Sequence, residues 1–445
     1  MNKTNKKNDI IAALASPYGK SAVAVIRISG DGCKNTVEKR LACPLKNGEL
    51  KYNTFKAAGF TEHLMAVFFE GPHSYTGEDT VELYPHGNTA ICDGIIKALS
   101  DDGVRLAERG EFTKRAFLNG KLDLMKCEAL ADIIDAQTTE QLVYGNARYD
   151  GQFRALEKTE KELNKALSTV EAVLHYGDEL EGEDIENTVI TDVFNAIDDA
   201  MKLLEGEISA FDGGKIINDG FKIAVIGEPN VGKSTLLNAL TESDRAIVTD
   251  IAGTTRDTID GEYVYNGRKF VIIDTAGIKE HTADEVEKIG IERAKIAASA
   301  ADAVLYVVTD ERSTVKLPDF GVKNAVVVNK CDEITDVGTD HKAAEMDGKL
   351  RISAKFGKNI TALKQKLYDM CPKEHGALCN HRQFACAVRC YDSLKAAKAE
   401  GEKAESLEIV AALLYDAYSA ITSLHGENAD ESVISSVFER FCVGK

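Results

Sequence analysis

The sequence of 445 residues contains no stretch that approaches 18 consecutive uncharged apolar residues. A helix needs about 20 such residues to cross a bilayer, so we expect no membrane-spanning helix. The first eight residues include three lysines and lack an apolar core, unlike a secretory signal. The sequence therefore predicts a cytoplasmic protein without a membrane segment.

Positive charge is also scarce, because 54 lysines and arginines oppose 72 aspartates and glutamates, a formal net charge of −18. Such a balance argues against a protein whose whole surface coats nucleic acid, although it leaves room for a local basic patch. The ten cysteines show no framework of short regular spacings. They are therefore expected to be reduced thiols in a cytosolic protein.

Three compositional regimes follow one another along the chain. Up to about residue 120, short β-type runs at 23–28 and 64–69 and a predicted helix at 90–100 indicate an α+β domain. From about 122 to 176 proline is absent and glycine is scarce. Apolar residues at the spacing of a helix that packs along another helix are Leu156, Leu163, Leu167, Val170 and Leu174. Residues 188–210 continue this helical pattern.

At Gly213-Gly214 the helical pattern is predicted to end, and an α/β alternation begins. Apolar runs at 223–226, 270–273, 303–308 and 325–328 predict a mostly parallel sheet buried on both faces. The pair Asn266-Gly267 predicts a type I′ hairpin turn. After about Met370 the chain returns to helix. We therefore expect a domain at 1–120, a helical domain at 121–212 and 376–445, and an α/β domain at 213–375 inserted into it.

Glycines and a lysine follow the first strand of the α/β domain in Gly227-Glu-Pro-Asn-Val-Gly-Lys-Ser234, the pattern of a phosphate-binding loop. A predicted helix at 235–240 follows, so backbone N–H groups and a helix N-terminus can bind phosphates. Lys233 is expected to reach the outer phosphates, and the Ser234 hydroxyl to ligate Mg²⁺. The predicted nucleotide contacts of this loop are Asn230, Val231, Gly232, Lys233, Ser234 and Thr235.

Three shorter motifs follow the later predicted strands in order. The first is Asp274, Thr275, Ala276 and Gly277, where a carboxylate can act through Mg²⁺. Next come Asn329, Lys330 and Asp332, whose carboxylate can accept two N–H bonds from guanine, and then Ser353, Ala354 and Lys355. Each motif is weak evidence by itself. Together, at strand ends where α/β proteins bind ligands, they predict a GTP site.

A polar segment between the first helix and the hairpin is predicted to be the first switch loop. Its expected nucleotide contacts are Thr249, Asp250, Ile251, Ala252, Gly253, Thr254 and Thr255, with Thr255 as the second Mg²⁺ ligand. Ile278 follows Gly277, at the position where Ras-type GTPases carry the glutamine that orients the attacking water. An isoleucine cannot do this, so either hydrolysis is slow or the catalytic group comes from elsewhere.

Together with Ile278, two segments resemble the MnmE (TrmE) family of tRNA-modification GTPases, Gly253-Thr-Thr-Arg-Asp257 and Phe441-Cys-Val-Gly-Lys445. Residues 26–30, 74–79 and 108–123 are similar to the folate-binding domain of that family. The resemblance covers nearly the whole chain. It implies an N-terminal folate-binding and dimerising domain, a helical domain, and a Ras-like GTPase domain inserted into the helices.

The resemblance also implies how the missing glutamine is replaced. A K⁺ ion, bound when two GTPase domains meet, would be held by Asn230, Thr249, Ile251 and Thr254. The water would be oriented by Glu287, which with Lys233 would form the catalytic pair. The chain has one more residue between Gly277 and this glutamate than a family member with which it aligns readily, so Glu285 is the alternative.

By the same resemblance the protein is a homodimer that works with an FAD-dependent partner, MnmG, in a heterotetramer. Together they would modify carbon 5 of the wobble uridine of certain tRNAs to a carboxymethylaminomethyl or aminomethyl type. The one-carbon unit would come from 5-formyl- or 5,10-methylene-tetrahydrofolate. The implied folate contacts are Arg27, Glu82, Lys121 and Lys445. Cys442 is a candidate reactive thiol or a packing residue.

Two other functions remain open from the sequence. An RNA-binding assembly factor of the Era or EngA kind shares the phosphate loop and the hydrophobic residue after the switch glycine, but would carry a KH-type module. A signalling switch would show slow turnover that does not distinguish K⁺ from Na⁺.

Overall fold

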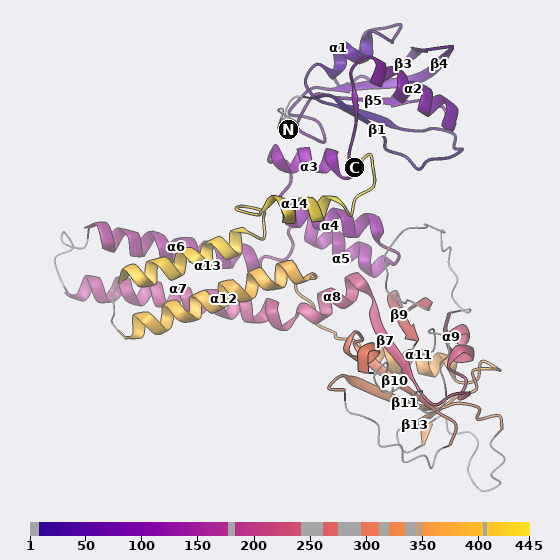
Figure 1. The fold of residues 1–445 in the computed structure, drawn as a ribbon. Coiled ribbons are helices and arrows are strands. Elements are labelled where there is room, and N and C mark those ends of the chain that lie inside the picture. Colours follow the sequence, from indigo (N-terminus) through magenta and orange to yellow (C-terminus); the bar gives the residue numbers. More distant parts are fainter. Residues whose placement is uncertain are drawn as a thin grey trace. The chain divides into compact units, whose positions relative to one another are not determined.

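The computed structural model describes residues 9–176, 183–241, 261–274, 295–310, 320–333, 345–346, 349–403 and 407–445 (Figure 1). The chain forms two compact units. The first comprises the residues up to Ile134, Arg148–Asp150 and Ser419–Lys445, and the second comprises Asp135–Ala147 and Gly151–Tyr418. Both ends of the chain therefore belong to the same unit.

A six-stranded sheet forms the centre of the first unit, in the order β3-β4-β5-β2-β1-β6. Neighbouring strands are antiparallel, except that β1 and β6 are parallel. The strands are β1 (Ile11–Leu14), β2 (Ile26–Ser29), β3 (Lys51–Ala57), β4 (Phe60–Phe69), β5 (Thr80–Tyr84) and β6 (Arg105–Leu106). Alternate residues such as Ile26, Phe55 and Leu83 are fully buried and form one core with Ile95 and Leu99. These two lie on the helix α2 (Thr89–Asp101), and a short helix α1 (Cys33–Glu38) adds to the same core.

The C-terminal residues of the chain complete the first unit. Helices α3 (Glu111–Leu118), α4 (Leu124–Asp135) and α14 (Glu431–Phe438) lie around a second core. There Leu124 of α4 packs with Phe438 and Phe441. Gly110 has φ 66°, and a Cβ at this position would lie 2.3 Å from the Phe438 carbonyl oxygen. Only glycine fits this approach of the two backbones.

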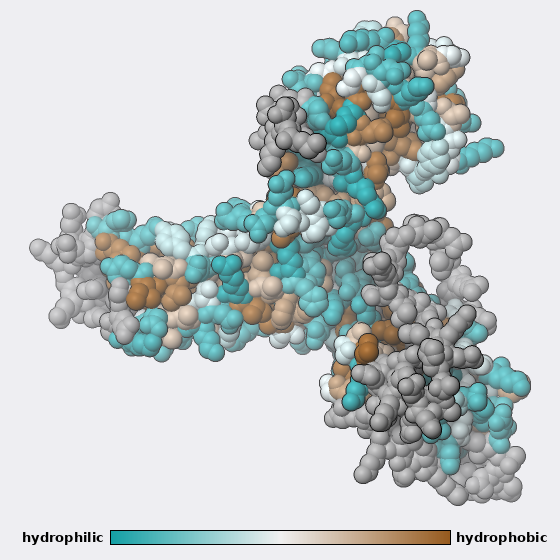
Figure 2. Space-filling view, in the orientation of Figure 1, coloured by the Kyte–Doolittle hydropathy of each residue, from teal (hydrophilic) through white to brown (hydrophobic). Residues whose placement is uncertain are grey.

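The second unit contains a group of long helices, and one of them confirms most of the apolar stripe predicted for 156–174. Helices α6 (Ala155–Tyr176), α7 (Glu183–Ser209) and α12 (His381–Glu402) lie side by side (Figure 1). Helix α13 (Leu407–Thr422), which belongs to this unit up to Tyr418, contacts α6 through the hydrogen bond of Tyr415 to Glu171. In α6 the predicted apolar stripe is buried from Leu156 to Val170, but Leu174 in the last turn is 38% exposed. Hydrophilic residues cover much of the visible surface of these helices (Figure 2).

A seven-stranded sheet follows in the second unit, in the order β12-β13-β11-β10-β7-β9-β8. Its strands are β7 (Phe221–Ile226), β8 (Gly261–Tyr265), β9 (Arg268–Asp274), β10 (Ala303–Val308), β11 (Lys323–Val328), β12 (Glu345–Met346) and β13 (Lys349–Arg351). Five strands run parallel, while β8 and β12 are antiparallel to their neighbours. Val225 packs into the core of one face and Ala224 into that of the other, which confirms the mostly parallel sheet.

The turn between β8 and β9 also follows the prediction. Asn266 has φ 49° and Gly267 has φ 81°, the pair of positive values that a type I′ turn requires. The turn joins two antiparallel strands. Among the helices that the structure describes, none is both long and apolar enough to cross a membrane.

The predicted break at Gly213-Gly214 is wrong, because both glycines lie inside helix α8 (Phe211–Asp219). A Cβ on Gly213 would lie 2.0 Å from the Glu374 carbonyl oxygen, and one on Gly214 would lie 2.3 Å from that of Leu378. The glycines therefore allow a close approach to the segment 374–378 rather than end the helix.

Candidate functional sites

The predicted nucleotide motifs follow strands whose carboxyl ends share one edge of the sheet. Strand β7 is followed by the loop at 227–232, β11 by Asn329 and β13 by residues 352–355. These strands are parallel, and β9, which ends at Asp274, is parallel to β7. Ligands in open parallel sheets bind outside this edge.

The phosphate loop has the backbone shape that a phosphate site needs. Asn230 has φ 65° and Gly232 has φ 93°, and helix α9 (Lys233–Thr241) begins directly after them. The Lys233 Nζ donates to the carbonyl oxygens of Gly227 and Glu228, each at 2.9 Å. The ammonium therefore lies over its own loop. When a nucleotide binds, its outer phosphates would replace these carbonyl oxygens as the acceptors.

Asn329 joins the predicted phosphate loop to the segment that follows β13. Its side chain is buried, its Nδ2 donates to the Val231 carbonyl oxygen at 2.8 Å, and its Oδ1 accepts from the Ala354 N–H at 3.0 Å. A Cβ on Gly232 would lie 2.5 Å from the Asn329 Nδ2, so this approach also requires glycine. Three of the predicted motifs are thus tied together by one buried amide.

Asp332 presents an exposed carboxylate beside this amide. The Ser353 hydroxyl lowers the pKa of Asp332 below its ordinary value of 3.8 and is the largest cause of that shift. The Ser353 Oγ is buried. An ionised carboxylate and a buried polar atom at this place suit the N–H groups of a guanine ring.

Several predicted residues lie outside the described ranges. They are Thr249, Asp250, Ile251, Ala252, Gly253, Thr254, Thr255, Thr275, Ala276, Gly277, Ile278, Glu285 and Glu287.

A second cluster lies in the first unit, where β2 and β5 pair. Their register places Arg27 opposite Glu82, and the Arg27 Nε donates to the Glu82 carboxylate at 2.8 Å. The Tyr84 hydroxyl donates to the same carboxylate at 2.5 Å. Burial, followed by Glu82, raises the pKa of Tyr84 to about 12, so the tyrosine remains a hydrogen-bond donor at neutral pH.

The last residues of the chain reach this cluster. The Arg27 Nη1 donates to the Gly444 carbonyl oxygen at 3.3 Å. Lys445 is half-buried, and its pKa is lowered first by burial and then by the nearby charge of Arg27, against the pull of Glu82. The structure therefore brings Arg27, Glu82 and Lys445 together. The Lys121 Nζ donates instead to the Pro72 carbonyl oxygen at 2.9 Å.

Aromatic side chains that the sequence analysis did not assign complete the cluster. The Arg27 guanidinium lies over the rings of Tyr75 and Phe112, at 5.1 and 5.8 Å from their centroids. Cations over rings and a paired carboxylate suit a flat heterocycle with a charged tail. Tyr84 could have been found, because it stands two residues after Glu82 on the same face of a strand. Cys442 is exposed.

Comparisons with known proteins cover both units. The profile of the GTP-binding protein TrmE N-terminus matches residues 10–121, and that of the MnmE helical domain matches residues 124–442. The second match includes α12 and α13.

Curated relatives match the chain from end to end. The tRNA modification GTPase MnmE of Thermosipho melanesiensis is 34% identical over 451 residues, with 98% of this chain and 100% of that protein covered. The protein of the same name from Fervidobacterium nodosum is 36% identical over 467 residues, with coverage of 99% and 98%. A crystal structure of Era in complex with MgGDPNP and 16S ribosomal RNA nucleotides is 26% identical. It covers 39% of this chain and 66% of that chain, with a TM-score of 0.25.

Proposed function

Because the chain belongs to the tRNA modification GTPase MnmE family, we propose that it is a K⁺-stimulated GTP hydrolase activated by dimerisation. The observation that supports this best is the buried Asn329 amide, which ties the phosphate loop to the loop that reads guanine. The two loops would hold the phosphates and the base of one nucleotide at a fixed separation.

The described residues would bind GTP from its two ends. Lys233 and the loop N–H groups would contact the outer phosphates, and Asp332 would accept hydrogen bonds from guanine. Ser234 and Thr255 would hold Mg²⁺, which supplies positive charge to the phosphates when bound. The shape of the loop supports this assignment, since a side chain on Gly232 would collide with Asn329.

The water-orienting role belongs in this proposal to Glu287, with Glu285 as the alternative. Asn230, Thr249, Ile251 and Thr254 would hold K⁺, which adds the charge that an arginine finger supplies in other GTPases. The remaining predicted contacts of the switch segments would bind the nucleotide; they are Asp250, Ala252, Gly253, Asp274, Thr275, Ala276 and Gly277.

The first unit would bind the folate that supplies the one-carbon unit. Arg27, Glu82 and Lys445 support this assignment by their contacts, with Tyr75, Tyr84 and Phe112 as further walls. Lys121 would need to leave its bond to Pro72 to take part. Cys442 would be either a reactive thiol or a packing residue, the two alternatives predicted from the sequence.

The substrate in this proposal is the wobble uridine of certain tRNAs, modified at carbon 5 in the cytoplasm together with MnmG. The domain division proposed with it is 1–120, 121–212, 213–375 and 376–445, with the GTPase domain as the insertion. Mass spectrometry of tRNA nucleosides from cells that lack this protein tests the substrate. Nucleosides that match those of normal cells would overturn it.

The cation dependence tests the hydrolytic mechanism. Replacing K⁺ by Na⁺ at constant ionic strength is expected to slow GTP hydrolysis by the purified full chain at least about tenfold, since each factor of ten corresponds to about 1.4 kcal/mol in the barrier. Phosphate release is the measurement. Equal rates in the two salts would favour the signalling-switch alternative.

Glu287→Ala is expected to leave GTP affinity unchanged, because the glutamate acts on the water and not on the nucleotide. Hydrolysis should fall by about a hundredfold or more, the usual contribution of a positioned acid–base group. Binding of a fluorescent GTP analogue and single-turnover hydrolysis measure the two effects. A variant that hydrolyses at the normal rate would transfer the role to Glu285, whose alanine variant is the matched comparison.

A further inference from the structure

Three side chains of one short helix hold the inserted α/β part at three separate places. The helix is α5 (Thr139–Tyr149). The Gln141 Nε2 donates to the Asn218 carbonyl oxygen of α8 at 2.8 Å, and the Tyr144 hydroxyl donates to the Gly376 carbonyl oxygen at 2.8 Å. Glu140 binds Arg268 at the start of strand β9. The helix thus contacts the segment that leads into the sheet, the segment that leads out of it, and the sheet itself.

Arg268 is the centre of the contact with the sheet. Its Nε donates to the Glu140 Oε2 at 3.0 Å and its Nη2 to the Oε1 of the same carboxylate, a two-point arrangement. Its Nη1 donates to the Pro372 carbonyl oxygen at 3.1 Å, and the guanidinium lies 5.7 Å from the centroid of the Tyr368 ring. The arginine side chain is only 10% exposed and that of Glu140 is 30% exposed, so water screens this pair less than a surface pair.

Strand β9 connects this ion pair to the nucleotide site. It begins at Arg268 and ends at Asp274, and it pairs with β7 on one side and β8 on the other. Six steps of about 3.3 Å separate its two ends by roughly 20 Å. The register with β7 runs from Phe270 to Asp274 and that with β8 from Arg268 to Ile272, so one continuous hydrogen-bonded strand joins the two ends.

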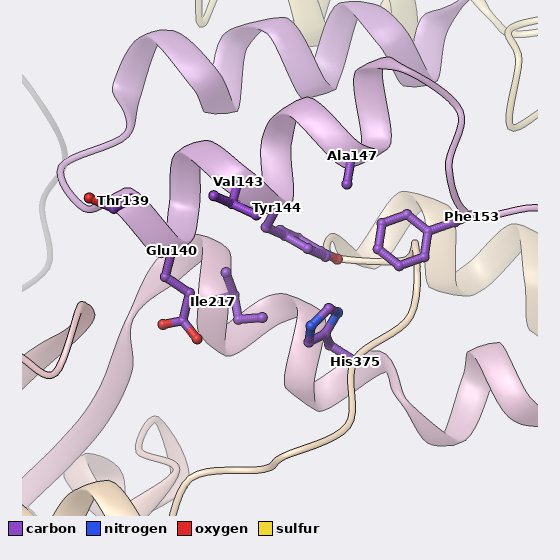
Figure 3. A pocket seen from close by; sticks show the side chains of 8 residues that line it. All are labelled: Thr139, Glu140, Val143, Tyr144, Ala147, Phe153, Ile217 and His375. Atoms are coloured by element: carbon purple, nitrogen blue, oxygen red, sulfur yellow. The ribbon is translucent and has the colours of Figure 1, made fainter.

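Helix α8 and the segment 374–378 are packed backbone against backbone, and side chains beside this contact line a pocket. Gly213 and Gly214 let helix α8 touch the segment 374–378 backbone to backbone. Beside them opens a pocket of about 250 Å³ in which the rings of Tyr144, Phe153 and His375 meet edge to face (Figure 3). Glu140 and Ile217 line the same pocket. Its walls come from α5, α8 and the outgoing segment, so any movement between them repacks these rings.

We propose that Glu140 and Arg268 are positioning residues that transmit the state of the nucleotide site to helix α5. This proposal rests on the proposed function. Displacement of β9 during the GTP cycle moves α5 through the ion pair, and tRNA modification depends on that movement. Hydrolysis itself does not depend on the pair, because the pair lies about 20 Å from Asp274 along the strand. Breaking the pair therefore separates the two activities.

Glu140→Lys tests this separation, because it places a like charge against Arg268. A matched control stands on the same hairpin, where Lys269 binds Glu262 at 2.9 Å within the sheet. Glu262→Lys makes the same change of charge without touching α5. The charge-exchanged double variant Glu140→Arg with Arg268→Glu restores the attraction in the opposite sense. Thermal unfolding of each purified full-length variant shows whether it folds.

Two activities are measured for each variant, GTP hydrolysis by the purified chain and the modified tRNA nucleoside in cells that carry only that variant. Glu140→Lys is expected to hydrolyse GTP within about twofold of the native rate while the nucleoside falls at least tenfold. The Glu262→Lys control should keep both activities, and the charge-exchanged variant should recover the nucleoside.

A Glu140→Lys variant that keeps the native level of nucleoside overturns the inference, and so does an equal loss of both activities. If that variant fails to fold, the charge-exchanged variant decides. A folded charge-exchanged variant that makes the modified nucleoside supports the inference. A folded one that does not make it overturns the inference. A native chain that makes no modified nucleoside overturns the proposed function itself, which the variants do not affect.

Discussion

At the scale of single residues, Asn329 and Asp332 belong to one predicted motif but lie in different surroundings. The sequence predicts that both contact GTP and that the Asp332 carboxylate binds guanine, and the structure buries the Asn329 amide between the Val231 carbonyl oxygen and the Ala354 N–H. Asp332 remains exposed. Asn329 therefore holds the loops of the site together, while Asp332 is the residue proposed to bind guanine.

Asp332→Asn is expected to weaken GTP binding by roughly ten- to a hundredfold, the usual effect of losing a hydrogen bond to a charged group. An amide can donate to an oxygen at the position where guanine carries its amino group. The variant should therefore gain affinity for xanthosine triphosphate. Competition between the two triphosphates measures both effects.

Asn329→Asp is the control, since it changes the neighbouring amide that binds the loops. We expect it to weaken both triphosphates without exchanging the preference. An Asp332→Asn variant that still prefers GTP as strongly as the native chain would show that another group reads the base.

Motif residues were predictable because their chemistry stands in the order of the sequence. The register of β2 and β5, which sets Arg27 opposite Glu82, was not. Tyr75 and Phe112 approach the same guanidinium from a loop and from α3, and no local pattern links positions so far apart. The resemblance to a family named Arg27 and Glu82, whereas their aromatic neighbours needed the fold.

At the scale of elements, strands were easier to predict than the end of the helical segment. Runs such as 303–308 are apolar throughout because both faces of a parallel sheet are covered. Gly213-Gly214 indicated the end of a helix, since glycine usually weakens a helix. Here the need for close contact with residues 374–378 outweighs that cost, and this contact is made by residues more than 150 positions away.

Glu207 of α7 binds the segment 374–378, which leads out of the inserted sheet. Its carboxylate is buried and accepts from the Ala377 N–H at 2.7 Å. Burial raises the pKa of Glu207 above its ordinary 4.5, although the N–H groups of Ala377 and Leu378 act in the opposite direction. The folded state therefore binds this proton more tightly than the unfolded state does.

By linkage, the contribution of Glu207 to the free energy of unfolding is largest below pH 4.5 and falls as pH rises through the raised pKa. Glu207→Gln keeps an oxygen for the Ala377 N–H but has no proton to lose. Above the raised pKa of Glu207, we expect the variant to have a larger free energy of unfolding than the native chain. Below pH 4.5 this difference should vanish. Urea unfolding across the pH range measures the difference.

Glu205→Gln is the matched control, because Glu205 lies on the same helix with its carboxylate exposed beside the Tyr391 hydroxyl. This variant measures how the loss of one negative charge from the helix changes the free energy of unfolding. A Glu207→Gln difference that does not change with pH would mean that the Glu207 carboxylate keeps its ordinary pKa.

At the scale of the whole molecule, the two ends of the chain belong to one unit and the sheet with the GTP motifs belongs to the other. The return of the chain to helix after the α/β part indicated an insertion from the sequence alone. The sequence did not predict the tertiary contacts of the last residues, because these contacts depend on the backbone of residues some 330 positions earlier. The Gly110 N–H donates to the Cys442 carbonyl oxygen at 3.4 Å, and the Phe112 N–H to that of Lys445 at 3.2 Å.

This arrangement predicts that the last four residues serve the first unit alone. Deleting residues 442–445 removes the Lys445 ammonium and the Gly444 carbonyl oxygen that accepts from Arg27. The loss of a charge-assisted contact should weaken binding of 5-formyl-tetrahydrofolate at least about tenfold. GTP hydrolysis should stay within about twofold, because the second unit does not include these residues.

Calorimetric titration with the folate and phosphate release from GTP measure the two effects on one preparation. Cys442→Ser is the control: its side chain is exposed, so it should bind the folate like the native chain unless the thiol reacts with it. If the shortened chain binds the folate normally, Lys445 has no part in the site and the cluster around Arg27 must hold the ligand without it. If hydrolysis falls together with folate binding, the end of the chain acts on both units, and the division of labour between them is wrong.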